Sequence, residues 1–245
     1  AAPSAAVSGG AASAYAMRLE IVGLRVGRPS GRGRALARPV AGTEVPGGLK
    51  PAPQAALEIV GLRSLPEVRP GDDLGGLIRR AARRERRRLD AATVLVVAQK
   101  VVSKAEGAVV DLGTVRPSPR ARRWAAKLGR DPRLIEVILR ESRRIVRAGR
   151  GVLIAETRHG FVTANAGVDQ SNVAGQDTVT VLPRDPDASA RRLRRALGCG
   201  AVIITDTFGR PWRIGLVNVA IGVAGLDALL DYRGLPDRAG RPLRS

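Results

Sequence analysis

The sequence contains little of several residue types on which common protein functions depend. Its 245 residues include one cysteine, Cys199, and one histidine, His159. A single cysteine excludes an intramolecular disulfide, and there is no Cys/His cluster of the kind that binds structural zinc. Aromatic residues make up only 2% of the chain, so few rings are available to stack on single-stranded bases. No apolar run is long enough to span a bilayer, and the start lacks the basic and apolar regions of a signal peptide. We therefore expect a cytoplasmic protein with no membrane partner.

Acidic residues are also scarce relative to basic ones. The formal net charge is +20 at pH 7, which favours a polyanionic partner. However, nearly all the basic residues are arginines, a bias that genome composition alone can produce, and the only lysines are Lys50, Lys100, Lys104 and Lys127. None of the helix-turn-helix, zinc-finger or oligonucleotide-binding signatures is evident. The sequence therefore argues against a nucleic-acid partner, while its 44% hydrophobic content is sufficient for a folded core.

The first part of the chain differs in composition from the rest. Residues 1–56 are rich in Gly, Pro, Ala and Arg, so we expect a largely disordered or linker-like extension, followed by a folded domain at 57–245. The heptapeptide LEIVGLR occurs at Leu19–Arg25 and again at Leu57–Arg63. Two units are too few for a repeat solenoid. The simplest interpretation is a local duplication of a strand, whose copies could compete for one sheet edge.

From Leu57 onward, strand-like and helix-like patterns alternate, but without the regular succession of βαβ units that is typical of a dinucleotide-binding fold. This predicts an α+β fold with a mixed α/β sheet. An Asp72 or Asp73 cap should start a helix at Leu74, with an arginine-rich solvated face. The other predicted helices are Pro119–Leu128, Asp131–Arg143 and Asp187–Leu197. The predicted strands are Leu57–Leu62, a buried strand in Ala92–Gly107 that runs into a polar loop, Val152–Glu156, Gly160–Ala164 and Ala201–Thr205, with a further apolar segment at Leu216–Ala224.

The apolar strand AVIIT ends in a carboxylate and a hydroxyl, Asp206 and Thr207. Two hard oxygen ligands at a strand tip suit Mg²⁺ or Mn²⁺. Arg210 and Arg213 follow, and their guanidinium groups could hold phosphate or carboxylate oxygens beside such a metal. An aspartate in this position can also serve only as a turn former or a helix cap.

A second acidic loop has the sequence NAGVDQSN. It carries Asp169 after Gly167, where the glycine permits a sharp turn. Asp169 could bind a cation that bridges to a phosphate, and Asn172 could form a hydrogen bond with a nucleotide. The alternative is an Asx-turn network that satisfies only the loop's own backbone.

A third loop, QKVVSKAEG, contains two of the four lysines. The ammonium groups of Lys100 and Lys104 are compact charges suited to phosphate oxygens, and Gln99 and Ser103 add hydrogen-bonding groups. Neither the Walker A motif nor G-x-G-x-x-G is present, so a nucleotide would have to be held in another way.

Four motifs in order, QKVVSKAEG, ETRHGFVTANAGVDQSNV, VLPRDPDASARRLR and VIITDTFGRPWRIGLVNVAIGVAG, resemble the coenzyme F420-0:L-glutamate ligase family. The resemblance covers Leu57–Ser245. It implies a mixed α/β enzyme, usually a homodimer, that uses GTP with Mg²⁺ or Mn²⁺ and often K⁺. Its small-molecule substrates would be F420-0, L-glutamate and GTP.

The resemblance also implies roles for individual residues. Lys104 would position the phosphate chain and stabilise its charge, and we add Arg210 as a second candidate catalytic residue. Nucleotide contacts would come from Leu65, Pro66, Glu67, Val68, Gln99, Lys100, Lys104 and Asn172. Divalent metal would be bound by Asp169, Asp206 and Thr207. The sequence departs from the family in two ways: small hydroxyl residues are more usual where it has Gln99 and Lys100, and the family continues into a C-terminal segment that bears further nucleotide contacts, so we expect a truncated domain with reduced activity.

The expected reaction is addition of L-glutamate to F420-0, and to its growing γ-linked tail, through an acyl phosphate made with GTP. The alternatives are a metal-dependent phosphoryl-transfer enzyme and a non-catalytic nucleotide-binding or polyanion-binding protein. Cys199 is expected to be a packing residue and His159 a turn residue.

Overall fold

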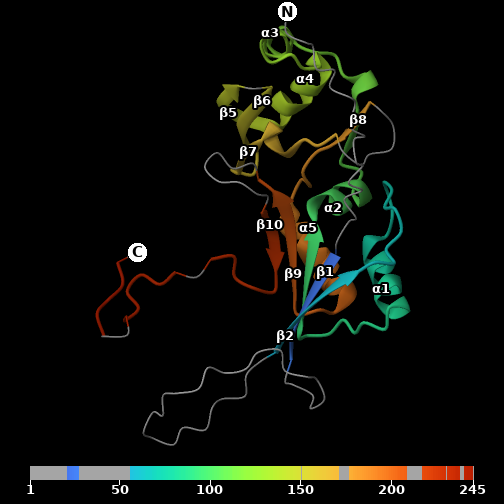
Figure 1. Cartoon of the computed structure of the whole chain (residues 1–245), viewed down its shortest axis with the longest axis vertical. Helices are drawn as coiled ribbons and strands as arrows, with labels where there is room; N and C mark the ends of the chain where they lie inside the picture. The colour runs from blue at the N-terminus through green and yellow to red at the C-terminus, as the bar shows by residue number, and fades with distance from the viewer. Residues whose placement is uncertain are drawn as a thin grey trace, which may run out of the picture.

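A computed structural model describes residues 21–27, 56–149, 151–170, 177–208, 217–229, 231–237 and 240–244 (Figure 1). The strands are β1 (Ile21–Gly27), β2 (Ala56–Leu62), β3 (Thr93–Ala98), β4 (Val109–Asp111), β5 (Ser142–Gly149), β6 (Val152–Thr157), β7 (Val162–Ala164), β8 (Thr178–Thr180), β9 (Ala201–Thr207) and β10 (Asn218–Ala224). The α-helices are α1 (Leu74–Arg84), α2 (Gln99–Ala105), α3 (Pro119–Leu128), α4 (Pro132–Glu141) and α5 (Pro186–Leu197), with 3₁₀ turns η1 (Leu112–Thr114) and η2 (Asn165–Gly167). No helix in the described part of the chain is long and apolar enough to cross a membrane.

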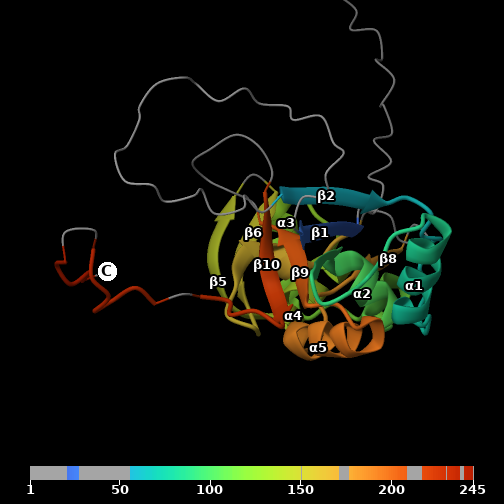
Figure 2. The ribbon, with the colours of Figure 1, turned by 90° about the horizontal axis from the view of Figure 1, so that it is seen from below.

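A mixed five-stranded sheet, in the order β10-β9-β3-β1-β2, forms the larger layer. Only the β3–β9 pair is parallel, and its neighbours pair antiparallel. Figure 2 shows α1 and α5 lying along this sheet, and both helices bury their apolar faces there. The core of this layer includes Ile78, Leu95, Leu193, Val202 and Ile204. Burial of such side chains is the main contribution to the stability of the layer.

The two copies of LEIVGLR pair with each other. β1, which contains most of the first copy, lies between β2 and β3 and pairs antiparallel with both. The register places Val22 opposite Gly61 and Gly23 opposite Val60. The copies therefore occupy adjacent places in the sheet and do not compete for one.

A second layer, built on the three-stranded sheet β5-β6-β7, occupies the other end of the molecule (Figure 1). Its core includes Leu112, Ile135, Ile138, Leu153 and Val179. Ser118 caps α3 by accepting a hydrogen bond from the Ala121 backbone N–H, and this helix ends at Gly129, whose φ of 63° suits glycine. The short β4–β8 pair is a third sheet.

The predicted α+β class is confirmed, and several element boundaries agree closely. α3 has its predicted bounds, and Asp73 caps α1 by accepting from the Gly76 backbone N–H at 3.0 Å. The arginine-rich face of α1 is exposed, as predicted. α4 ends at Glu141, two residues before the predicted end, because Ser142 begins β5. The sequence pattern does not predict β4, β5 or β8, because short strands and an arginine-rich strand lack an apolar alternation.

Prediction for Gly222. An added Cβ at Gly222 in β10 would lie 2.5 Å from the carbonyl carbon of Pro186, the first residue of α5. Gly222→Ala should therefore push α5 off the sheet and lower the free energy of unfolding by about 1–3 kcal/mol. Gly149→Ala in β5 is the matched control, because a Cβ there meets nothing within 4 Å. Urea denaturation of both variants checks this, and equal stabilities would contradict the proposed contact.

Candidate functional site

The candidate site begins at the carboxyl ends of the two parallel strands. Ala98, the last residue of β3, lies opposite Thr205 of β9, so the next residues, Gln99 and Asp206, are neighbours. The Gln99 side chain forms a hydrogen bond with the Asp206 carboxylate. In α/β sheets, this edge is the usual location of ligand sites.

The lysine segment is a helix, and the predicted polar loop is wrong. Residues Gln99–Ala105 form α2, in which Val101 and Val102 are fully buried in the core of the larger layer. Gln99, Lys100, Ser103 and Lys104 are buried as well. The four polar residues concealed the short apolar stretch that anchors this helix.

Asp169 reaches the same site from the second layer. η2 turns the chain through positive φ at Asn165, Ala166 and Gly167. The tightest point is Gly167, where a Cβ would lie 2.7 Å from Leu182. Asp169 then pairs with Thr180 through two backbone hydrogen bonds of 3.0 and 2.8 Å, and its carboxylate lies 2.5 Å from the Lys100 Nζ.

Asp206 is held in an environment that disfavours its charge. Burial and, to a smaller extent, the negative charge of Asp169 raise the pKa of Asp206 to about 6. The backbone N–H of Thr207, the charge of Lys100 and the hydrogen bond from Gln99 oppose this rise. The two aspartates are therefore close enough to repel each other.

The donor set fits a hard divalent cation. The carboxylates of Asp169 and Asp206 supply negative charge, and a cation between them would relieve their repulsion. The Thr207 hydroxyl donates to Asn218 Oδ1 at 2.6 Å and keeps its lone pairs available. Within the described residues, no group of three or more His, Cys, Asp or Glu side chains could hold a metal. Two carboxylates and one hydroxyl are few protein ligands, so they suit an ion that retains several water ligands, as Mg²⁺ does.

The segment Leu65–Val68 contacts the other end of α2. Val68 is buried in the core, Leu65 packs against it, and Pro66 and Glu67 are exposed. The Glu67 carboxylate accepts a hydrogen bond from the buried ammonium group of Lys104. The Lys104–Glu67 ion pair therefore joins this segment to α2.

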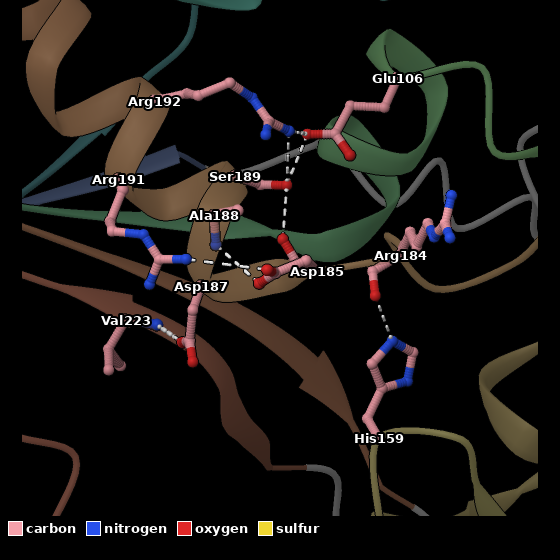
Figure 3. Close-up of polar contacts among 10 residues, drawn as sticks. All are labelled: Glu106, His159, Arg184, Asp185, Asp187, Ala188, Ser189, Arg191, Arg192 and Val223. Atoms are coloured by element: carbon pink, nitrogen blue, oxygen red, sulfur yellow. Dashed lines mark hydrogen bonds and ion pairs between the residues drawn. The ribbon is translucent and has the colours of Figure 1, made fainter.

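A polar cluster that the sequence pattern does not predict fixes α2 against α5 (Figure 3). The Glu106 carboxylate, just after α2, accepts from the Ser189 hydroxyl and from Arg192 Nη2, both at 2.5 Å. At the start of α5, Asp187 accepts from the Val223 backbone N–H at 2.8 Å, which ties the helix to β10. Recognition of α2 as a helix would have identified Glu106 as the residue that follows its last turn.

Two predicted structural residues have the expected roles. His159 lies in the turn between β6 and β7, where its Nε2 is 3.1 Å from the carbonyl oxygen of Arg184 (Figure 3). Its ring stacks on Phe161, which contacts Phe208 edge to face. Cys199 is buried, and burial raises the pKa of its thiol, which suits packing and not nucleophilic attack.

The structure thus brings together Gln99, Lys100, Asp169 and Asp206, with Thr207 next along β9. Lys104, one helical turn from Lys100, extends this group toward Glu67. The predicted nucleotide contact Asn172 and the arginines Arg210 and Arg213 lie outside the described residues.

Prediction for Asp206. Burial raises the pKa of the Asp206 carboxyl group in the folded protein to about 6, from an ordinary value of 3.8. Between these values the folded state binds more protons than the unfolded chain, so this group makes the protein less stable as pH rises from about 4 to above 6. Asp206→Asn should remove that loss. As pH rises from 4 to 7.5, the free energy of unfolding of the variant should therefore increase by roughly 2–3 kcal/mol relative to that of the wild type. Urea denaturation with a chelator present measures this. If the free energies of unfolding of the two proteins changed equally with pH, the prediction would be contradicted.

Comparison with known proteins gives this geometry a family. The family model for F420-0:Gamma-glutamyl ligase matches residues 62–245. The chain is 52% identical over 183 residues to "Coenzyme F420:L-glutamate ligase" of Methanopyrus kandleri, covering 73% of this chain and 70% of the relative. Proteins of the same name from Methanothermobacter thermautotrophicus and Natronomonas pharaonis are 45% identical (77% of each chain) and 44% identical (76% of this chain, 73% of the relative). A match over this much of the chain means that it belongs to the F420-0:gamma-glutamyl ligase family.

Proposed function

We propose that this protein is a ligase that joins L-glutamate to F420-0 and to its growing tail, using GTP and a divalent metal ion. The observation that carries the proposal is the shared position of two carboxylates and two buried lysines at one end of the parallel strand pair. The carboxylates match the charge of a metal, and the lysines match that of a phosphate chain. The names of the relatives contain F420 and L-glutamate, and the description of the family contains F420-0, which supports these two substrates.

The chemistry requires activation because a carboxylate has no suitable leaving group. In the proposed reaction, a carboxylate oxygen of the acceptor attacks the γ-phosphorus of GTP, and GDP leaves. The α-amine of L-glutamate then attacks the acyl carbon and loses a proton, and inorganic phosphate leaves with the bonding electrons. Both steps build negative charge on phosphate oxygens, so the protein can accelerate them by fixing positive charge nearby.

The residues that the fold brings together at the site would each have a role in this reaction. Lys104 and Lys100 would hold phosphate oxygens, and burial strengthens these interactions relative to those in water. Asp169, Asp206 and Thr207 would hold Mg²⁺ or Mn²⁺, which supplies charge neutralisation when bound. Gln99 would fix the orientation of Asp206 through their hydrogen bond. The roles of Asn172 and Arg210, the K⁺ ion, the homodimer and the cytoplasmic location stay predictions.

The test of the function combines product detection with a matched pair of variants. Protein, F420-0, GTP, Mn²⁺ and L-glutamate should yield F420 carrying added glutamyl residues by mass spectrometry, with GDP released in proportion. Asp206→Asn should reduce this rate at least about a hundredfold, since charge stabilisation of this kind contributes factors of that size. Glu58→Gln should not, because Glu58 pairs with the exposed Arg87 in the β2 region, away from the site.

The same assay separates the two alternatives. GDP release that does not depend on L-glutamate would indicate a phosphoryl-transfer enzyme. Nucleotide binding without turnover would indicate a binding protein, and either result would overturn the proposed ligase activity.

A further inference from the structure

The ion pair between Lys104 and Glu67 is unequal in burial. The Lys104 side chain is 5% exposed, whereas that of Glu67 is 68% exposed. The ammonium group is therefore fixed inside the protein, and the carboxylate that neutralises it comes from the surface.

The two partners also differ in how firmly they are held. Lys104 lies in α2, whose neighbours Val101 and Val102 are fully buried. Glu67 lies in a segment without helix or strand, between the exposed Pro66 and the buried Val68. The Glu67 side chain can thus rotate into water at little cost, while Lys104 cannot follow it.

A buried ammonium group needs a negative partner, because an unpaired charge in the interior is costly. Any anion that binds Lys104 must therefore compete with the Glu67 carboxylate. An anion with more negative charge than one carboxylate, such as a phosphate chain, is favoured in that exchange.

The Lys100 pair provides a contrast within the same helix. Its carboxylate partner, Asp169, has its backbone fixed by two hydrogen bonds to Thr180 and is less exposed, at 39%. The Asp169 carboxylate is therefore held next to its lysine, whereas the Glu67 carboxylate can move away from Lys104 into the solvent.

We propose that Glu67 is a resting counter-ion of Lys104, which the phosphate chain of the nucleotide displaces when it binds. This inference depends on the proposed function, since it assigns an event to the same nucleotide site. Glu67 would hold the buried lysine charged and in place between turnovers, at the cost of weakening nucleotide affinity.

The test measures anion affinity without turnover. Inorganic tripolyphosphate is titrated into the wild type and Glu67→Gln at pH 7 by isothermal calorimetry. With its competitor neutral, Lys104 should bind tripolyphosphate about tenfold more tightly in the variant, a typical size for coupling between two groups. The melting temperature without ligand should fall, because Lys104 loses its counter-charge, and should recover when tripolyphosphate is added.

A double variant distinguishes this exchange from a general change in net charge. In a Lys104→Met background, Glu67→Gln should leave tripolyphosphate affinity unchanged, and Glu58→Gln should have no effect in either background. Weaker binding by Glu67→Gln would overturn the proposal, as would a gain that persists without Lys104. A gain seen only with L-glutamate as the titrant would assign the lysine to a different substrate and overturn it too.

These outcomes are separable from the fate of the proposed function. Glutamate-dependent GDP release by the wild type, together with unchanged tripolyphosphate affinity in Glu67→Gln, would retain the ligase activity and reject the resting counter-ion. Failure of the wild type and the variant to bind tripolyphosphate would reject the resting counter-ion whatever the ligase assay gives.

Discussion

The parallel pairing of β3 with β9 is the constraint on which the site depends. It sets Ala98 opposite Thr205, so the residues that follow, Gln99 and Asp206, must lie side by side. Residues about a hundred positions apart in the chain are thereby joined without any long side chain having to reach across. α2 starts at this point, and its orientation decides where both buried lysines lie. A shift of one residue in the β3–β9 register would separate Gln99 from Asp206 and turn every side chain of the shifted strand to the other face.

The site gathers charges that would each be costly alone. The charge of Asp169 helps to raise the pKa of Asp206, the buried ammonium group of Lys100 pairs with Asp169, and the buried ammonium group of Lys104 pairs with Glu67. Such an arrangement is typical of functional sites, where stability is sacrificed for the ability to bind charged ligands. The Glu106 cluster and the Asp187 contact hold α2 and α5 rigid around it (Figure 3).

The sequence identified residues that the fold brings together better than it identified the secondary structure that carries them. Asp206 could be found because the apolar part of β9 gives way to polar residues there, and Asp169 because Gly167 marks a turn. Lys100 and Lys104 stand out by their rarity, but the pattern of their segment predicts a loop, because four polar residues hide its two buried valines. Glu106, Ser189 and Arg192 could not have been grouped, since their contact joins two helices that only the tertiary fold brings together. Short strands such as β4 and β8 were missed for the same reason: pairing defines them, not pattern.

The paired copies of LEIVGLR carry a consequence for how such a chain can evolve. Their register is reciprocal: Ile21 faces Leu62 while Leu24 faces Ile59, and Arg25 faces Glu58. A segment with this property is complementary to itself when it runs antiparallel, with opposite charges near its two ends. Duplication of the stretch therefore delivers a new strand together with a matching partner, and no further substitution is needed before the sheet can grow by one member.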